Sequence, residues 1–177
     1  MSEYWIETVS GKRFDFVDTM PSMFTIPDIA THLSNLCRFT GAVDRFVSVA
    51  EHCIHVSSLL PENLKLHGLL HDGSEAYMND LSSPVKALCT EYKRIEKKIQ
   101  SIIYQTFAGH VPSRDEAAMI KWADRTSMRS EAEQCRSVDC KHWPIFQEDA
   151  WPMSIEIQCW DSIAAKTRYI EAWANLQ

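Results

Sequence analysis

Residues 69–75 of the chain read Leu-Leu-His-Asp-Gly-Ser-Glu, so a histidine and two acids directly follow an apolar pair. We predict that they lie near the end of a helix running from Asn63 to Asn79. A buried carboxylate needs a compensating partner, and a divalent cation is one such partner. At about 100° per residue, His71, Asp72 and Glu75 would fall within roughly one third of the helix circumference and face one point in the core.

Two further helices carry candidate ligands for the same ion. His52 lies at the edge of an apolar stripe on a helix predicted from Ala42 to Leu60. Asp124 lies on a helix that Ser113 and Glu116 open as a capping box. Two imidazoles and two carboxylates suit Co, Mn, Zn, Fe or Mg rather than a thiolate zinc site. On an octahedral ion they leave room for water and a phosphate oxygen, as in metal-assisted hydrolysis.

A structural interpretation of the same residues stays open at this point. His-Asp dipeptides recur by chance, and an isolated buried histidine such as His52 is commonly a hydrogen-bonded core residue. The spacing of His67 and His71 suits zinc, but the metalloprotease glutamate is missing because residue 68 is Gly. We predict that His55 and His67 are hydrogen-bonded core histidines. The other three are predicted to lie at the surface or beside the metal ligands: His32, His110 and His142.

Helical periodicity runs through most of the chain, so we predict an all-α bundle with at most a small N-terminal β-hairpin. The hairpin is expected over Trp5–Phe16, and Pro27-Asp28 suits the first turn of the first helix. Loops are expected over Asp80–Pro84 and over 137–154. Two more amphipathic helices are predicted with these core-facing residues: Tyr92, Ile95, Ile99, Ile102 and Phe107 in one, and Trp160, Ile163, Ala164, Thr167, Ile170 and Trp173 in the last.

The composition is that of an ordinary globular protein. The 177 residues are 45% hydrophobic and 24% charged, which suits a single compact domain over 1–177. The net charge of -6 argues against a protein that binds nucleic acid through bulk charge. No apolar run is long enough to span a membrane, and the N-terminus lacks signal-peptide character. We therefore expect a cytoplasmic protein with reduced, structural cysteines and no membrane partner.

The order of the candidate ligands, His52, then His71-Asp72, then Asp124, resembles the H…HD…D pattern of the HD-domain phosphohydrolase superfamily. The blocks Ser48–His52, Leu70–Glu75 and Asp80–Lys86 are similar to those of bacterial 5′-deoxynucleotidases. Upstream stretches resemble a phage and bacterial branch that includes the dATP triphosphohydrolases of viruses that replace adenine by 2-aminoadenine: Ser10–Phe14, Asp28–Ala30 and Leu33–Gly41. The similarity covers nearly the whole chain and implies a single HD-type helical domain.

The resemblance also implies a role for each matching position. The metal ligands would be His52, His71, Asp72 and Asp124. Glu75 would orient or deprotonate the attacking water, and Asp80 would assist as acid, base or substrate orienter. The alternative for Asp80 is a turn residue at the C-terminus of a helix.

Five further residues are candidates for substrate binding. Arg38 and Lys86 are the candidate phosphate-binding cations, although each alone could be a solvated surface charge. Phe24, Ile26 and Pro84 could wall the base and exclude a ribose 2′-hydroxyl, because an apolar group beside C2′ would leave that hydroxyl desolvated and unpaired. An ordinary core or turn role is the alternative for all three.

The leading functional hypothesis is a phage-type triphosphohydrolase of dATP or other dNTPs, which would act in the host cytoplasm if it is phage-encoded. One alternative is a 5′-deoxynucleotidase acting on dNMPs, and another is a non-catalytic nucleotide sensor. Cyclic-dinucleotide and (p)ppGpp hydrolases share the superfamily site, but they carry further blocks that we do not find in this sequence. We expect a homo-oligomer, and the Trp-rich C-terminal third is a candidate interface or an extension of the core: Trp143, Trp151, Trp160 and Trp173.

Overall fold

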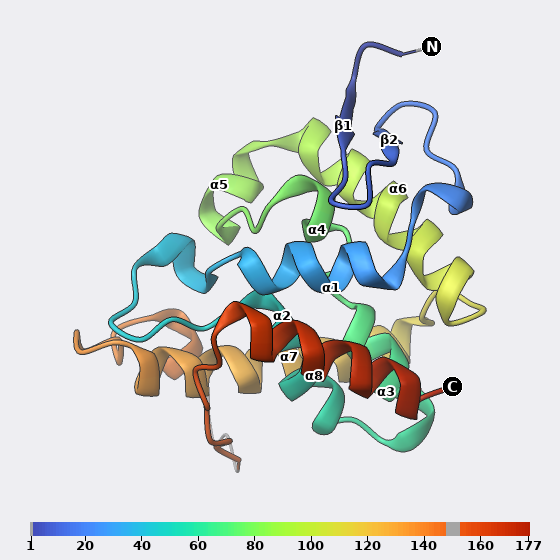
Figure 1. The fold of residues 1–177 in the computed structure, drawn as a ribbon. Helices are drawn as coiled ribbons and strands as arrows, with labels where there is room; N and C mark the ends of the chain where they lie inside the picture. Colours follow the sequence, from blue (N-terminus) through green and yellow to red (C-terminus); the bar gives the residue numbers. More distant parts are fainter. Residues whose placement is uncertain (1, 148–152) are drawn as a thin grey trace.

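The computed structural model describes residues 2–147 and 153–177, and within these ranges it is a helical bundle with one two-stranded hairpin (Figure 1). This confirms the predicted all-α fold with a small N-terminal hairpin. The part of the predicted aromatic loop that contains Trp151-Pro152 lies outside the described residues. No helix in the described ranges combines the length and the apolar character needed to cross a bilayer.

The hairpin is fastened to the start of the first helix. Strand β1 (Trp5–Glu7) pairs antiparallel with β2 (Arg13–Asp15), and Gly11 takes a positive φ of 75° in the turn between them. Asp28 of helix α1 (Ile26–Asn35) accepts hydrogen bonds from the backbone N (3.1 Å) and the Oγ (2.8 Å) of Ser10. A short 3-10 helix, η1 (Pro21–Met23), leads into α1. The hairpin and the start of α1 therefore lie where the sequence predicted them.

Helix α2 (Val49–Ser58) begins later than predicted, at Val49 instead of Ala42. The preceding residues include a 3-10 helix, η2 (Arg38–Gly41), and an isolated antiparallel bridge between Cys37 and Ser48. The Oγ of Ser48 then accepts from the backbone N of Glu51 at 3.1 Å and caps α2. Because the helix begins only at Val49, Phe46 lies outside it and is 38% exposed.

The helix predicted over Asn63–Asn79 is interrupted in the structure. Helix α3 (Glu62–Leu70) ends before the His71-Asp72 pair, and a short helix α4 (Glu75–Met78) follows after a series of turns. Gln100 of helix α6 (Thr90–Phe107) spans the break, because its side chain donates to the carbonyl of Leu70 (2.7 Å) and accepts from the N of Ser74 (3.0 Å). One amide side chain thus replaces hydrogen bonds that a continuous helix would make.

The loop after α4 is shorter than predicted. Helix α5 (Ser83–Leu88) begins inside the expected loop, with Pro84 in its first turn, a position that proline tolerates well. Helix α6 follows as predicted. Ile99 is fully buried on it, and its other predicted core-facing residues are partly buried: Tyr92, Ile95, Ile102 and Phe107.

The last two long helices begin at side-chain caps. Helix α7 (Arg114–Cys135) begins with the predicted capping box of Ser113 and Glu116. After a 3-10 helix, η3 (Pro144–Phe146), the chain reaches helix α8 (Ser162–Asn175), capped by Asp161.

The face that α8 buries differs from the predicted one. Ala165 and Tyr169 are fully buried, whereas Ile163 is 77% exposed and Thr167 is also exposed. The Tyr169 hydroxyl donates to the carbonyl of Leu69 at 2.8 Å, which fixes this rotation of the helix. Three of the predicted residues are partly buried against the core: Trp160, Ile170 and Trp173.

Helix α2 lies at the centre of the bundle. It packs against α1, α3, α7 and α8, and in Figure 1 it lies behind α8 and α1. Val49, Ala50, Cys53 and Val56 are fully buried, and Cys53 is a free thiol. A polar side chain on this helix therefore faces the interior of the protein and must find partners there.

Glu51 of α2 anchors the segment that precedes α8. Its side chain is fully buried and accepts three backbone hydrogen bonds, from Gln158 (2.9 Å), Cys159 (2.8 Å) and Trp160 (2.9 Å). Cys159 adopts a positive φ of 57°, an unusual conformation for a non-glycine residue, within this turn. Burial raises the pKa of the Glu51 carboxyl, although the three amide donors oppose this shift.

We predict that Glu51→Gln will lower the free energy of unfolding by roughly 1–3 kcal/mol, because the amide places an NH₂ group against backbone donors. Urea denaturation followed by circular dichroism measures this change. Glu62→Gln is the matched control, since the Glu62 side chain is 79% exposed and its ion pair with Lys65 should contribute little. Equal unfolding midpoints for the two variants would contradict the role given to Glu51.

Candidate metal centre

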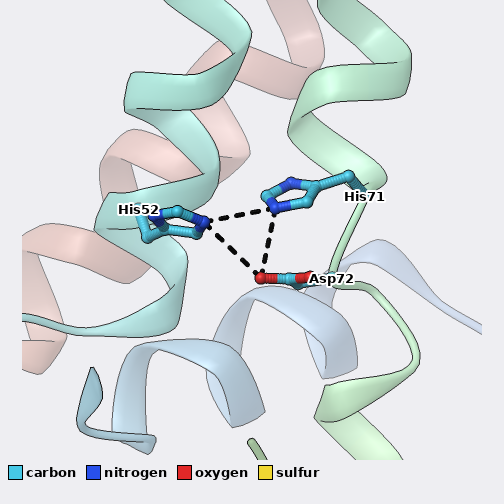
Figure 2. Close-up of side chains that lie close together, drawn as sticks. All are labelled: His52, His71 and Asp72. Carbon is cyan, nitrogen blue, oxygen red and sulfur yellow. Dashed lines mark hydrogen bonds and ion pairs between the residues drawn. The ribbon is translucent and has the colours of Figure 1, made fainter. Parts of the chain in front are cut away.

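Three of the predicted ligands meet where α2 passes the end of α3. The Nε2 of His52 lies 3.2 Å from the Nε2 of His71 and 3.6 Å from the Oδ2 of Asp72. The same Oδ2 lies 3.2 Å from the Nε2 of His71, which closes a triangle of donor atoms (Figure 2). These three ligand atoms all lie within 4.8 Å of one another, so the group can hold a metal ion.

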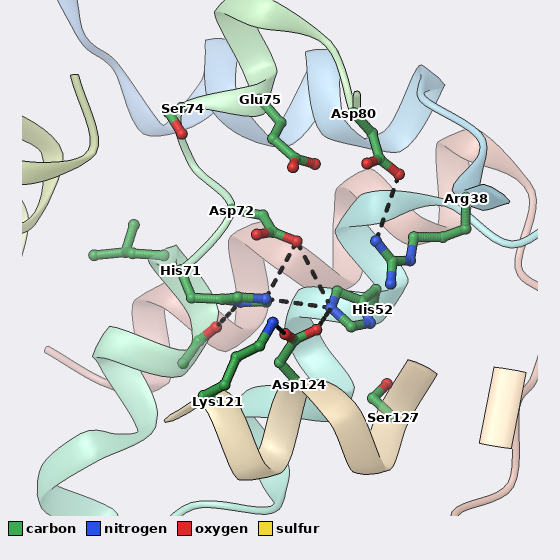
Figure 3. A network of polar contacts seen from close by, with 12 residues as sticks. Arg38, His52, His71, Asp72, Ser74, Glu75, Asp80, Lys121, Asp124 and Ser127 are labelled. Carbon is green, nitrogen blue, oxygen red and sulfur yellow. Dashed lines mark hydrogen bonds and ion pairs between the residues drawn. The ribbon is translucent and has the colours of Figure 1, made fainter. Parts of the chain in front are cut away.

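Asp124 of α7 joins this triangle from the opposite side. Its Oδ1 lies 3.3 Å from the Nε2 of His52, and its Oδ2 lies 2.5 Å from the Nζ of Lys121 (Figure 3). Asp124 therefore contacts the group through His52, while the three residues whose ligand atoms all lie close to one another are His52, His71 and Asp72.

The spacing and the chemistry of these donors fit a divalent cation. Ligands about 2.1 Å from one ion lie about 3.0–3.4 Å from their neighbours in octahedral or tetrahedral geometry, and the distances around His52 are close to this range. Lone pairs of two imidazoles and two carboxylates that face one point repel one another unless a positive charge lies between them. A cation at this point would satisfy all four groups.

The electrostatics of the site favour positive charge at its centre. Burial alone would lower the pKa of His71, but the Asp72 carboxylate outweighs this effect and raises that pKa well above its usual value. Burial and the charge of Arg38 lower the pKa of His52, but Glu131 and Asp124 outweigh them, so the pKa of His52 is also raised. Burial opposes ionisation of Asp124, yet the two histidines hold its pKa well below the usual value. Both carboxylate ligands are therefore ionised at neutral pH, as metal binding requires.

Hydrogen bonds fix the orientation of both imidazole rings. The Nδ1 of His71 lies 2.8 Å from the carbonyl oxygen of Gly68, which can only accept, so Nδ1 carries the proton and Nε2 faces the centre. The Nδ1 of His52 lies 2.6 Å from the Oε1 of Glu131. Each ring therefore presents Nε2, the atom that a metal would bind.

Glu131 is a site residue that sequence reasoning missed. It is fully buried on α7, where it also accepts from the Oγ of Ser127 (2.8 Å) and the Nε of Arg38 (3.0 Å). Burial opposes its ionisation, but His52 and Arg38 lower the pKa of its carboxyl to about 2. Glu131 follows Asp124 by about two helical turns, so the two acids share one face of the helix. That spacing is the signal in the sequence that could have identified it.

Glu75 of α4 extends toward the centre from above in Figure 3. It is only 4% exposed, and its Oε1 lies 3.3 Å from the Nζ of Lys86. Its Oε2 is buried and has no hydrogen-bond partner in the part of the chain that the structure describes. Burial, followed by the negative charges of Asp72 and Asp80, raises the pKa of the Glu75 carboxyl well above its usual value. A carboxyl in this state is suited to proton transfer.

Arg38 and Asp80 are bound to each other at the edge of the site. The guanidinium of Arg38 is buried between Glu131 and Asp80, with a distance of 3.4 Å to the Oδ2 of Asp80. Arg38 is therefore not a solvated surface charge, and both of its carboxylate contacts compete with any phosphate. Lys86 forms ion pairs with Glu75 and, at 2.6 Å, with Glu96.

A cavity of about 400 Å³ opens beside the cluster, between α6, α7 and the turns after α3. Its lining includes three of the candidate ligands, His71, Asp72 and Asp124, and three lysines, Lys86, Lys97 and Lys121. Lys97 and Lys121 are exposed and were not predicted as site residues. The cavity thus adjoins the candidate ligands and carries three lysines, of which Lys86 and Lys121 are paired with acids of the site.

The residues predicted to wall a base lie elsewhere. Phe24 and Ile26 belong to the hydrophobic core. The centroid of the Phe24 ring lies 5.2 Å from that of the Phe14 ring and 5.3 Å from that of the Tyr77 ring. Pro84 is exposed in the first turn of α5. None of the three is among the residues that line the cavity described above, and their role as a base wall stays a prediction.

The other histidines and the cysteines lie as predicted. His55 and His67 are buried, and His110 and His142 are exposed. His32 is half-buried between the backbone N of Val9 and the carbonyl of Ala76. All six cysteines are free thiols.

The chain is similar to two bacterial proteins. It is 36% identical to the uncharacterized protein YfdR of Escherichia coli (strain K12), in an alignment that covers 81% of this chain and 79% of YfdR. It is 34% identical to an uncharacterized protein of Rhodobacter capsulatus, over 76% of this chain and 74% of that protein. No protein-family model matches the sequence.

We predict that Asp72→Ala will abolish binding of Mn²⁺ or Co²⁺, because the centre loses an anionic ligand that contacts both histidines. Isothermal titration calorimetry of each metal into the metal-free protein measures this loss. Asp18→Ala, at an exposed position, is the control and should bind as the wild type does. Unchanged affinity in Asp72→Ala would rule Asp72 out as a ligand.

Proposed function

The chain belongs to the same family as the YfdR protein of Escherichia coli, and we propose that it is a metal-dependent phosphohydrolase of deoxynucleotides. The observation that carries the proposal is the convergence of His52, His71, Asp72 and Asp124 beside a cavity that carries three lysines. The order of these residues also resembles the HD-domain superfamily, whose members hydrolyse phosphoesters.

His52, His71, Asp72 and Asp124 would hold a divalent ion such as Co, Mn, Zn, Fe or Mg. When bound, the ion supplies Lewis-acid chemistry, since it lowers the pKa of water and offsets charge on the phosphoryl group. The mixed set of nitrogen and oxygen donors supports this group of metals over a thiolate site.

Glu75 is the candidate base for the attacking water. Its unpartnered, buried Oε2 and its raised pKa suit a group that accepts a proton from water. Lys86 contacts the other oxygen and fixes the orientation of the carboxylate. Asp80 follows α4, lies next to Glu75 in Figure 3 and is held by Arg38. It is the candidate acid or substrate orienter.

The lysines of the cavity support an anionic substrate. A protein with a net charge of -6 needs local cations to attract a nucleotide, and Lys86, Lys97 and Lys121 supply them around the proposed reaction centre. Lys121 contacts Asp124, so a phosphate bound by this lysine would lie next to the ion. The preference for a triphosphate rests on the similarity to dATP triphosphohydrolases.

The proposal predicts that the protein loaded with Mn²⁺ or Co²⁺ will release tripolyphosphate, or phosphate in steps, from dATP. Chromatography of products from dATP, dAMP and ATP measures both the reaction and the preference for deoxyribose. EDTA-treated protein and Asp72→Ala are the controls and should be inactive. Turnover of dAMP alone would favour a 5′-deoxynucleotidase, and tight binding of nucleotide without any turnover would favour a sensor.

We predict that Glu75→Gln will keep its affinity for Co²⁺ but lose about 10²–10⁴-fold in kcat, because an amide cannot accept the proton of water. Single-turnover hydrolysis and metal titration separate the two effects. Glu96→Gln is the matched control, since Glu96 also contacts Lys86 and lines the cavity. Equal losses in both variants would mean that Glu75 acts only through Lys86.

A further inference from the structure

We propose that Glu131 is a positioning residue of the metal centre, holding the His52 ring so that its Nε2 faces the other ligands. The inference rests on the proposed metal-dependent function, but it concerns binding of the ion and can be tested without any nucleotide. It also gives Arg38 a new role, as the support of Glu131 instead of a phosphate-binding cation.

The first argument is the geometry around the His52 ring. The carboxylate of Glu131 lies 2.6 Å from Nδ1, while Nε2 on the other side of the ring lies 3.2–3.6 Å from His71, Asp124 and Asp72. An imidazole that binds a metal through Nε2 must carry its proton on Nδ1. A carboxylate at Nδ1 accepts that proton in a hydrogen bond and makes the ring a stronger ligand.

The second argument is that Glu131 is itself held from both sides. Ser127, one turn earlier on α7, donates to the same Oε1 that contacts His52. Arg38 donates to Oε2 from the segment before α2. The Glu131 side chain has no exposed surface, so it cannot exchange these partners for water. A group restrained in this way can impose its orientation on His52.

The third argument concerns Arg38, whose backbone is equally constrained. Its N donates to the carbonyl of Val47 at 2.9 Å, next to the bridge between Cys37 and Ser48. Phe39 and Thr40 follow with positive φ angles of 55° and 54°, a costly conformation for both residue types. The guanidinium connects Glu131 to Asp80, so one cation links the support of His52 to the loop that carries a proposed catalytic acid.

A purely structural role is the competing explanation, in which Glu131 only neutralises the buried charge of Arg38. Two variants separate these explanations: Glu131→Gln, and the double variant Glu131→Gln with Arg38→Met, which also removes the buried cation. If Glu131 positions His52, both variants bind Co²⁺ about 10–100-fold more weakly than wild type. If Glu131 only neutralises Arg38, the double variant regains wild-type affinity and the proposal is wrong.

Calorimetric titration with Co²⁺ alone gives these affinities, and thermal unfolding without metal identifies any variant that fails to fold. Glu133→Gln is the matched control on the same helix, because Glu133 is exposed and contacts only Arg129 among the ion pairs of the described chain. It should leave the affinity unchanged.

Proton NMR of the Zn²⁺-loaded protein supplies a second readout that a structural role would not move. The wild type should show a downfield signal from the Nδ1 proton of His52, and Glu131→Gln should shift it upfield. Wild-type Co²⁺ affinity together with an unmoved signal in Glu131→Gln would overturn the proposal. If the wild-type protein binds Co²⁺ but hydrolyses no deoxynucleotide, the proposed phosphohydrolase function is wrong, and the inference about Glu131 and metal binding is unaffected.

Discussion

The arrangement of the site depends on one constraint, the burial of several carboxylates at the centre of a helical bundle. Asp72, Asp124 and Glu131 contact His52 of α2, and Asp72 and Asp124 also line the cavity. Glu75 extends toward the same cluster from α4 (Figure 3). Arg38 offsets the charge of Glu131, and His52 and His71, whose pKa values are raised, offset that of Asp72 and Asp124. Buried anions without cationic partners are costly, and a bound metal ion would take over the role of the histidine protons.

The break between α3 and α4 is part of the same solution. A continuous α-helix would have placed His71, Asp72 and Glu75 within about one third of its circumference, but the chain leaves the helix after Leu70 and places His71 and Asp72 in turns. The turns at this point are closed by hydrogen bonds between residues three apart instead of four. The backbone N of Gly73 donates to the carbonyl of Leu70, and that of Glu75 donates to the carbonyl of Asp72. Gln100 of α6 stabilises the interruption from outside the segment. Irregular backbone is therefore maintained where the ligands need it.

Local signals allowed much of the fold and part of the site to be predicted. The capping box of α7 and the N-terminal hairpin depend on short stretches of sequence, and the structure has both. The order of the candidate ligands singled out His52, His71 and Asp72, which the structure brings together, and Asp124, which contacts His52. The interruption after α3 and the rotation of α8 depend on distant partners, Gln100 and the Leu69 carbonyl, so periodicity could not reveal them. Glu131 escaped notice because a glutamate on a long polar helix ordinarily faces solvent.

Adjacent residues of α2 connect the stability of the bundle to its metal centre. Glu51 binds three backbone amides before α8, while His52 faces the candidate ligands in the turns after α3 and on α7. Any movement of α2 that loosened one set of contacts would displace the other. A ligand that binds only the folded protein stabilises it in proportion to the logarithm of its concentration. An ion bound by three separate segments would therefore stabilise the packing of the whole bundle around α2, including the C-terminal helix that supplies no ligand.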